Sequence, residues 1–495
     1  MKRFFYFFIS FSVSFASFSG NEIKAETSLD SIVVEKKVSE SISAEIQYEN
    51  KDLKPQFPGF VPFAEVIAFN IFIWSYDRFI LQKDYAKISP SIWKRNLREG
   101  WRFDDNHFAI NFFGHPYQGT YYHVAGRSSG YSFYQSLFFA SIGSWTWEYF
   151  AETEYPSIND FITTSLGGSL YGEMLFRLSQ RLLAKPDPTW FEQVQSFVLH
   201  PLSYFHWKAA GSRVYNPGYA PLEMSLALGG GYRFGSDYSY NKTAINEDRV
   251  SNEWNEFFGQ VSLNLVYGKP NKKVKQPGDY FTVTVSFEQG QEERIFKMNA
   301  SSKLHNYSRS YEDKAWLDLG LYLDFDTFYG DLAEMGNISI GLGLDIKAPL
   351  SDAITLRYLV KPGIIPIGSA DFNYDEIVRP NSVSRNDEIA RSYQYNFGAK
   401  FYTSVLLEFF ERYRIINAFD IHVMKTMPNS EPHYGARGYD VVGFNQAYLE
   451  AQLTENMCLG VRLDSYFKVA AYMGDDFEPM SRIMHTIGFY NRFLF

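Results

Sequence analysis

The sequence predicts an α+β membrane protein, in which an N-terminal helical domain precedes a closed antiparallel transmembrane β-barrel of about 12 strands. Two observations favour this class. The mean hydropathy of -0.26 is too low for a bundle of membrane-spanning helices, yet aromatic residues make up 18% of the chain. From Leu222 onward, apolar and polar residues alternate over long segments. A barrel accounts for both, because alternate residues face its wet interior and aromatic girdles mark the membrane interfaces.

The first 56 residues read as an export signal and a polar extension. In residues 1–20, Lys2 and Arg3 precede the apolar run Phe4–Val13, and small residues follow, which is the layout of a cleaved signal peptide. We expect cleavage between residues 16 and 25. Residues 21–56 are polar and charged, and we predict that they are partly disordered. The single cysteine, Cys458, excludes an intramolecular disulfide and a lipid-anchored cysteine at the cut.

Residues 57–205 form the predicted helical domain. An apolar run follows Pro58 and Gly59, and it carries scattered polar residues that would be costly in hydrocarbon. Apolar spacing and turn residues predict further helices over Ile92–Glu99, Asp105–Gly114, Ser132–Glu152 and Ile158–Leu183.

Residues 222–495 form the predicted barrel. In residues 281–288, Phe281, Val283, Val285 and Phe287 alternate with polar residues. Such alternation spans more residues than the usual soluble strand, and a transmembrane strand needs roughly 9–11 residues. We place the twelve strand starts near Leu222, Phe257, Tyr280, Glu293, Lys314, Gly336, Ala353, Ser392, Asn417, Val441, Met457 and Ile483. Ten or fourteen strands remain open, because the long loop around Glu376–Asp387 is the place where the count is least certain.

The last predicted strand indicates which membrane the barrel occupies. Its predicted lipid face is Ile487, Phe489, Phe493 and Phe495, and the chain ends on this aromatic residue. The ending resembles the C-terminal signal that the barrel-assembly machinery reads, although Tyr490 stands where that signal has glycine. We therefore expect localisation in the bacterial outer membrane, with outer-membrane lipids and the assembly machinery as partners. The net charge of -9 argues against nucleic-acid binding. The oligomeric state stays open.

The polar phase of the strands is expected to line the lumen. It includes Asp318, Asp324, Asp326, Asp345, Arg357, Asp420, His422, Cys458, Arg462 and Asp464. A lumen of this size is filled by side chains or an inserted element, or else it leaves a channel. We expect the helices to plug the lumen or to dock at its periplasmic mouth.

The segment Asp104–Glu173 resembles a bacterial family classified as domain of unknown function 3943. The resemblance rests on Asn111 through "HPYQGTYY", on Ala125 and Arg127, and on "GYSF", "WEYFAE", "PSIND" and "GGSLYGE". It implies the order of signal, helical domain and C-terminal barrel, and it assigns no activity.

Three spacings in this segment point to chemistry or to packing. His107, Asn111 and His115 share one helix face, which fits either a metal or proton-transfer site or a buried polar face between helices. The chain has no His-Glu-x-x-His motif and no other cluster with ligand spacing, so we predict no metal and no cofactor. Glu148 and Glu152 also share a helix face. They are either a pair of carboxyl groups that act as acid and base, or they have structural roles only. In the second case Glu148 pairs with Arg127 or with a helix end, and Glu152 is solvated.

The other polar residues have plain structural interpretations. Ser157 and Asp160 fit a helix N-cap with an acidic third residue. Gly168 and Gly172 give a smooth stripe that lets another backbone approach. Glu173 would be buried beside this stripe, and Arg177 is its nearest expected partner. The predicted binding or polar-network residues are Asn111, His115, Arg127, Asn159, Asp160 and Glu173.

Two functions remain open from the sequence. In the first, the protein is a binding, transport or structural element of the outer membrane, and the cluster is an internal polar network. In the second, it is an enzyme acting on envelope lipid or glycan. That enzyme would use His115 as acid or base and Glu148 or Glu152 to orient it, and Arg127 would bind phosphate or carboxylate.

Overall fold

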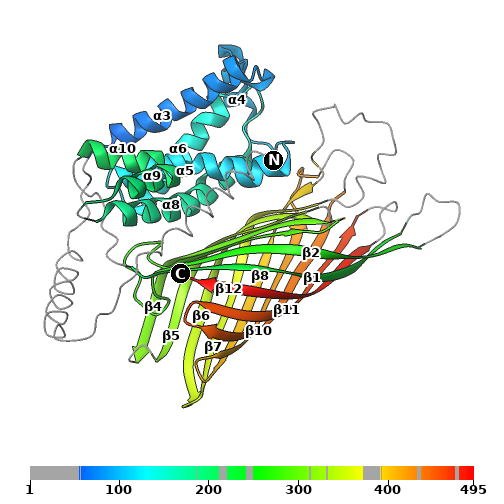
Figure 1. Ribbon diagram of the computed structural model, residues 1–495. Helices are drawn as coiled ribbons and strands as arrows, with labels where there is room; N and C mark the ends of the chain where they lie inside the picture. Colours follow the sequence, from blue (N-terminus) through cyan, green and yellow to red (C-terminus); the bar gives the residue numbers. More distant parts are fainter. Residues whose placement is uncertain are drawn as a thin grey trace.

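The computed structural model describes residue 55 and residues 57–185, 187–210, 220–240, 249–291, 293–311, 314–330, 333–371, 391, 393–431, 436–473 and 479–495. The predicted signal peptide, nearly all of the polar extension and the loop around Glu376–Asp387 lie outside these residues. The described chain has two parts, helices up to Ala210 and a barrel from Leu222 to Leu494 (Figure 1).

The helical domain consists of short and medium-length helices. Its elements are α3 (Phe60–Ser75), η1 (Tyr76–Ile80), η2 (Asp84–Ala86), α4 (Pro90–Glu99), η3 (Ile110–Gly114), α5 (His115–Ser128), α6 (Phe133–Phe150), α7 (Ile158–Ile162), η4 (Thr163–Gly167), α8 (Gly168–Leu183), α9 (Trp190–Leu199) and α10 (Pro201–Ala210). Ser132 and Thr189 begin α6 and α9 with complete capping boxes, which satisfy backbone N–H groups that a helix start leaves unpaired.

One predicted helix is shorter in the structure. Of the helix expected over Asp105–Gly114, only residues 108–114 are helical. The side chain of Asp104 accepts a hydrogen bond from the backbone N–H of Asn106 at 3.2 Å. Such a local bond offers the backbone an alternative to the helix, and the helix begins after it.

The barrel has twelve antiparallel strands and confirms the predicted fold class. They are β1 (Leu222–Tyr240), β2 (Arg249–Tyr267), β3 (Phe281–Gln289), β4 (Arg294–Tyr311), β5 (Ala315–Gly330), β6 (Glu334–Ser351), β7 (Ile354–Asp371), β8 (Tyr393–Phe409), β9 (Tyr413–Thr426), β10 (Gly438–Thr454), β11 (Met457–Tyr472) and β12 (Met480–Leu494). Each strand pairs with its neighbours in sequence, and β1 pairs with β12 to close the ring. A closed ring leaves no unpaired edge, which a sheet inside lipid requires.

Contacts between strands that are not neighbours show which face is the lumen. Arg462 on β11 lies 2.7 Å from Glu288 on β3, and Lys361 on β7 lies 2.6 Å from Asp324 on β5. Such pairs meet only across the interior, so the polar phase of these strands lines the lumen. Cys458 shares the phase of Arg462, is buried and lies 3.7 Å from an Arg492 nitrogen.

Side chains also cross the bore. Phe328 on β5 stacks on Tyr466 of β11, with ring centroids 5.1 Å apart, and packs on Phe444 of β10 at 5.5 Å. In the ring order, β5 and β11 are six places apart among twelve strands, so they stand on opposite walls. Buried apolar residues, among them Met335, surround this aromatic layer. Side chains therefore occupy the centre of the barrel at this level.

The outer face is apolar, and part of it is bare. On β12, Ile487 and Phe489 are exposed, the latter at 63%, as is the terminal Phe495. These are three of the four residues that the sequence assigns to lipid, and the fourth, Phe493, is half-buried. The alternate residue Tyr490 points inward and donates a hydrogen bond to Glu450 at 2.8 Å.

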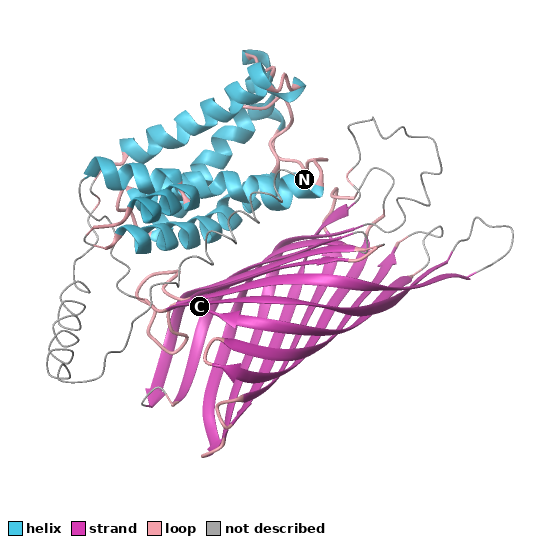
Figure 2. Ribbon diagram, in the orientation of Figure 1, coloured by secondary structure: helices cyan, strands magenta, loops and turns pink. Residues whose placement is uncertain are grey.

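The helical domain covers another part of this outer face. Phe325 on β5 is the neighbour of the lumenal Asp324 and therefore points outward, yet it is fully buried. It packs on Phe112 and on Tyr171 of α8, with centroids 6.3 Å and 5.0 Å away. Phe113 meets Phe296, an outward residue of β4, at 5.5 Å. Figure 2 shows the helices lying alongside the strands.

The expectation that the helices plug the lumen or dock at the periplasmic mouth is therefore wrong for this structure. The outward aromatic residues of the strands offer an apolar wall, and the helices bury that wall. The main core of the molecule is this seam, in which Phe112, Leu170 and Met174 of the helical side pack with Phe325 and Ile338 of the barrel.

Candidate functional site

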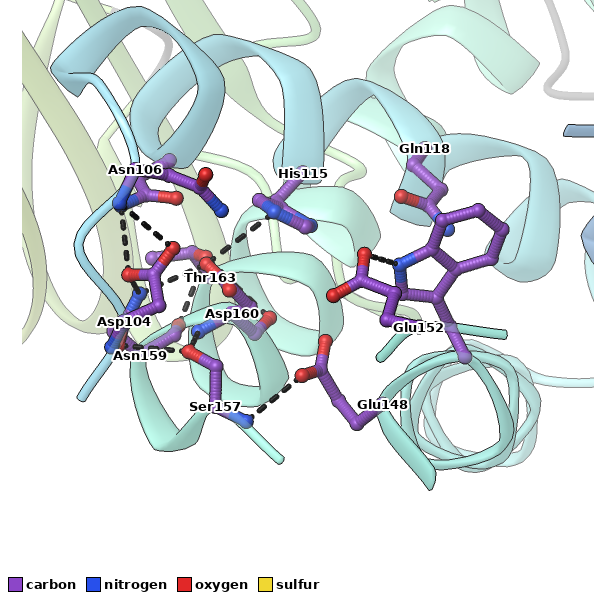
Figure 3. A network of polar contacts seen from close by, with 12 residues as sticks. Asp104, Asn106, His115, Gln118, Glu148, Glu152, Ser157, Asn159, Asp160 and Thr163 are labelled. Atoms are coloured by element: carbon purple, nitrogen blue, oxygen red, sulfur yellow. Dashed lines mark hydrogen bonds and ion pairs between the residues drawn. The ribbon is translucent and has the colours of Figure 1, made fainter. Parts of the chain in front are cut away.

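The candidate site lies in the helical domain, where three elements meet. His115 begins α5, Glu148 lies in the last turns of α6, and Asp160 lies in α7. One ligand atom from each of these three side chains falls within 4.8 Å of the other two, and all three residues are buried. The His115 Nε2 atom lies 3.4 Å from Asp160 Oδ1. Figure 3 shows Glu148 directed toward the same space as Asp160.

Ser157 holds two of these groups in place. Its hydroxyl accepts the backbone N–H of Asp160 at 3.2 Å, as an N-cap does, and donates to Asn159 Oδ1 at 2.8 Å. Its own backbone N–H donates to Glu148 Oε2 at 2.8 Å. The "PSIND" motif thus starts α7 and fixes one oxygen of Glu148 at the helix end.

Asp104 ties the cluster to the barrel. Its Oδ1 accepts hydrogen bonds from Asn159 at 2.7 Å, from Asn111 at 3.0 Å and from the hydroxyl of Tyr395 at 2.6 Å. Asn111 also donates to the hydroxyl of Tyr393 at 2.6 Å. Both tyrosines are buried residues at the start of β8, so the barrel wall sets one side of the site.

The rim of the site is less buried than its centre. Glu152 and Asp104 are half-buried, whereas His115, Glu148 and Asp160 are buried. Glu152 accepts a hydrogen bond from the indole N–H of Trp147. The buried part of the site therefore consists of one imidazole and two carboxyl groups, and two further carboxyl groups lie nearer the surface.

Burial and mutual repulsion shift the protonation of this cluster. Burial, and then the nearby Asp160 and Glu152 carboxyl groups, raise the pKa of Glu148 well above its usual range. Burial likewise raises the pKa of Asp160 and raises that of Glu152 to about 8. Burial lowers the pKa of the His115 imidazole. Without an added cation, the fold favours neutral forms of these groups.

A second buried cluster lies at the other end of α5. Glu173 of α8 accepts hydrogen bonds from Arg127 Nε and from Arg177 Nε, both at 2.7 Å, and lies 3.1 Å from His123 Nε2. Burial opposes the charge of Glu173, but the two guanidinium groups hold the pKa of its carboxyl below the usual range. This carboxylate is thus ionised and matched by cations.

The second cluster also contacts the barrel. Arg177 lies 2.8 Å from Asp279 and donates to the Pro277 carbonyl at 2.9 Å, and Arg127 donates to Gln276 at 3.2 Å. These three partners lie between β2 and β3. The cluster therefore joins α5, α8 and the barrel through charged hydrogen bonds.

The predicted site residues divide between these two clusters. Asn111, His115, Asn159 and Asp160 lie in the first, with Glu148 and Glu152, whereas Arg127 and Glu173 lie in the second. His107 is exposed. Glu148 contacts the N-cap of α7 and not Arg127. Asp104, Tyr393 and Tyr395 are site residues that the sequence did not predict. Of these three, only Asp104 had a sequence signal, because it is the first residue of the segment that resembles the family.

Comparison with known proteins bears on the class of the chain. Residues 100–202 match the family model described as a domain of unknown function, DUF3943, which confirms the resemblance to this family. No curated protein matches the chain. The structure is therefore a closed twelve-strand barrel with an attached helical domain, part of which, residues 100–202, matches this family model.

The barrel is similar to solved outer-membrane structures, at low identity. The NanC porin is 8% identical, with a TM-score of 0.24 over 53% of this chain and 98% of that chain. The Pseudomonas putida toluene transporter TodX is 8% identical, with a TM-score of 0.24 over 56% and 90%. The Escherichia coli outer membrane protease OmpT is 9% identical, with a TM-score of 0.20 over 56% and 98%. At these values no functional argument rests on the neighbours.

Proposed function

We infer that the protein is an integral protein of the bacterial outer membrane, in which the barrel supports a helical binding domain that faces lipid. The observation that carries this proposal is the seam on the outer wall. Helices that pack on outward residues of β4, β5 and β6 stand where lipid stands around the rest of the barrel. Their own outer surface then meets lipid as well.

The distribution of apolar and polar residues on α3 and η1 supports the contact of the helical domain with lipid. Residues Phe60–Ile80 are long and apolar enough to cross a membrane, by length and composition. Most exposed residues of this segment are large and apolar, such as Ile71 and Phe72, the latter 64% exposed. Its buried residues include polar Asn70, which donates to Thr146 at 2.9 Å and to the Gly143 carbonyl at 3.0 Å. An apolar exterior over a polar interior suits a lipid environment.

The helical domain, and not the bore, is the place for a ligand in this proposal. Side chains cross the bore at the aromatic layer of Phe328, Phe444 and Tyr466. The histidine–carboxylate cluster, in contrast, is held by the helices and reaches half-buried groups at its rim. The barrel then serves as the support that keeps this domain in the membrane.

Single cysteines test the lipid position. In a Cys458→Ser background, cysteines at Phe72, Ile487 and Lys94 are labelled with a fluorophore in vesicles that contain brominated lipid. We expect similar quenching at Phe72 and at the barrel position Ile487, and much weaker quenching at the exposed Lys94. Quenching at Phe72 as weak as at Lys94 would overturn the proposal. Fractionation with the outer membrane is required as well.

The alternative function is an enzyme that acts on envelope lipid or glycan. The convergence of His115, Glu148 and Asp160 favours it, since a histidine beside carboxyl groups of raised pKa suits acid–base chemistry. Arg127 has no part in this version, because Glu173 and Gln276 hold it in the other cluster. An altered envelope lipid or glycan composition in a His115→Ala strain with an intact barrel favours the enzyme, and His422→Ala is the control.

A further inference from the structure

The first cluster offers the ligand set of a metal site. One imidazole nitrogen and two carboxylate oxygens, from His115, Glu148 and Asp160, lie within 4.8 Å of one another. They come from α5, α6 and α7, so three elements fix the geometry. Nitrogen together with carboxylate oxygen is a donor set that suits divalent transition metals, among them Zn²⁺ and Mn²⁺.

An unsatisfied atom points into this space. Glu148 is 1% exposed, and its Oε1 atom has no hydrogen-bond partner within the described residues. The Ser157 N–H fixes its other oxygen, so Oε1 has no freedom to turn toward water. A buried oxygen without a partner is costly unless a ligand occupies its lone pairs. His115 Nδ1 is also buried and unpartnered.

Among the described side chains, Glu148 and Asp160 have no lysine or arginine partner. Asp104 and Glu152 add further carboxyl groups near Glu148 and Asp160. Across the part of the chain that the structure describes, no lysine or arginine forms an ion pair with Glu148 or Asp160. A cation would relieve the repulsion among these groups.

A second histidine–carboxylate group, in the barrel, has a lysine that balances the charge of its carboxylates. Asp326, Asp420 and His422 also place ligand atoms within 4.8 Å of one another. Lys400 Nζ lies 2.5 Å from Asp326 and 3.5 Å from Asp420, and the Asn337 amide lies 3.0 Å from His422 Nδ1. Lys400 thus already supplies a positive charge to the two carboxylates of this group.

We propose that His115, Glu148 and Asp160 bind one divalent transition-metal ion, with Zn²⁺ as the probe of choice. The half-buried Asp104 and Glu152 lie beside these ligands and nearer the surface. The proposal does not depend on the lipid position of the helices, because it rests on side chains inside the helical domain.

Calorimetry with Zn²⁺ tests the proposal on the full chain, folded in detergent micelles, stripped with a chelator and carrying no histidine tag. We expect one bound Zn²⁺, and an affinity about 100-fold lower or worse in His115→Ala and in the near-isosteric Glu148→Gln. The His422→Ala variant keeps the wild-type affinity. Circular dichroism and gel migration of the folded barrel check each variant.

X-ray absorption of the Zn²⁺-loaded protein gives a second readout. We expect a mixed nitrogen and oxygen shell with one imidazole. The proposal is overturned by absent Zn²⁺ binding in the wild-type chain, by undiminished affinity in folded His115→Ala and Glu148→Gln, or by a shell without imidazole.

Discussion

The two buried clusters of the helical domain share helix α5 and differ in charge. At one end, Glu173 lies between Arg127 and Arg177, and its pKa is lowered. At the other end, Glu148 and Asp160 lie beside further carboxyl groups, and their pKa values are raised. The comparison teaches that burial alone does not mark a functional group. The Glu173 cluster, whose carboxylate is matched by two guanidinium groups, is called the matched cluster, and it holds helices to the barrel. The cluster of His115, Glu148 and Asp160 is called the unmatched cluster, and it is the one proposed to bind a ligand.

The largest effect is expected from breaking the matched cluster. A Glu173→Gln exchange leaves two buried guanidinium groups short of a counter-charge, which typically costs about 3–5 kcal/mol. We expect a loss of this size in the free energy of unfolding, measured by urea titration of the micelle-folded protein.

The control for Glu173→Gln is Glu431→Gln. Glu431 pairs with Arg437, whose side chain is 48% exposed, and exposed pairs are worth roughly 0–1 kcal/mol. Equal losses in the two variants would contradict the structural role given to the Glu173 cluster.

A smaller effect is expected from the backbone contact between the two helices that carry the matched cluster. A Cβ atom on Gly168 of α8 would lie 2.4 Å from the Cα atom of Gly119 on α5. Backbone cannot move aside as a side chain can, so Gly168→Ala forces α5 and α8 apart. Overpacking of this kind costs about 1–3 kcal/mol. Gly259→Ala, where a Cβ meets nothing within 4 Å, is the matched control, and equal unfolding midpoints would refute the close approach.

The pH dependence of stability is expected to have opposite signs at the two clusters. The lowered pKa of Glu173 gives stability that is present above its usual pKa of 4.5 and is lost as pH falls. Glu152 has its pKa raised from 4.5 to about 8, so its contribution is present below pH 4.5 and is lost as pH rises through 8.

Unfolding of the chelator-treated protein across this pH range checks these signs. Glu173→Gln should flatten the acid side of the profile, and Glu152→Gln should reduce the loss on the alkaline side. The alkaline loss does not vanish, because the pKa values of Glu148 and Asp160 are raised as well, so these two groups contribute a loss of the same sign. The comparison fails if both variants act on the same side of the profile.

The barrel could be predicted from the sequence because its signal is local. Period-two alternation over long segments fixes strands and faces, and most strands begin within a few residues of their predicted starts. The lipid face of β12 follows from the same alternation. The side on which the helices dock could not be predicted, because the covered Phe325 and Ile338 are of the same residue types as the bare Ile487 and Phe489. Only three-dimensional packing distinguishes these two parts of the wall.

The site could be predicted in part. Pairs one helical turn apart, such as Glu173 with Arg177, follow from helix geometry. The grouping of Arg127 with His115 failed, because twelve residues along α5 separate the two residues by about 18 Å. The convergence of His115, Glu148 and Asp160 depends on the packing of three elements, which a single sequence does not encode locally.

Both clusters contact the barrel because the helical domain lies against its outer wall, and cross-linking tests this position most directly. Cysteines at Phe113 and Phe296, whose rings are 5.5 Å apart, are treated with a short bismaleimide in outer-membrane vesicles of a Cys458→Ser strain. We predict a high yield of the linked peptide pair by mass spectrometry, and little with Phe113→Cys and Lys297→Cys, since Lys297 faces the lumen. An equal yield from both pairs, or linkage only to the lumenal position, would contradict the account.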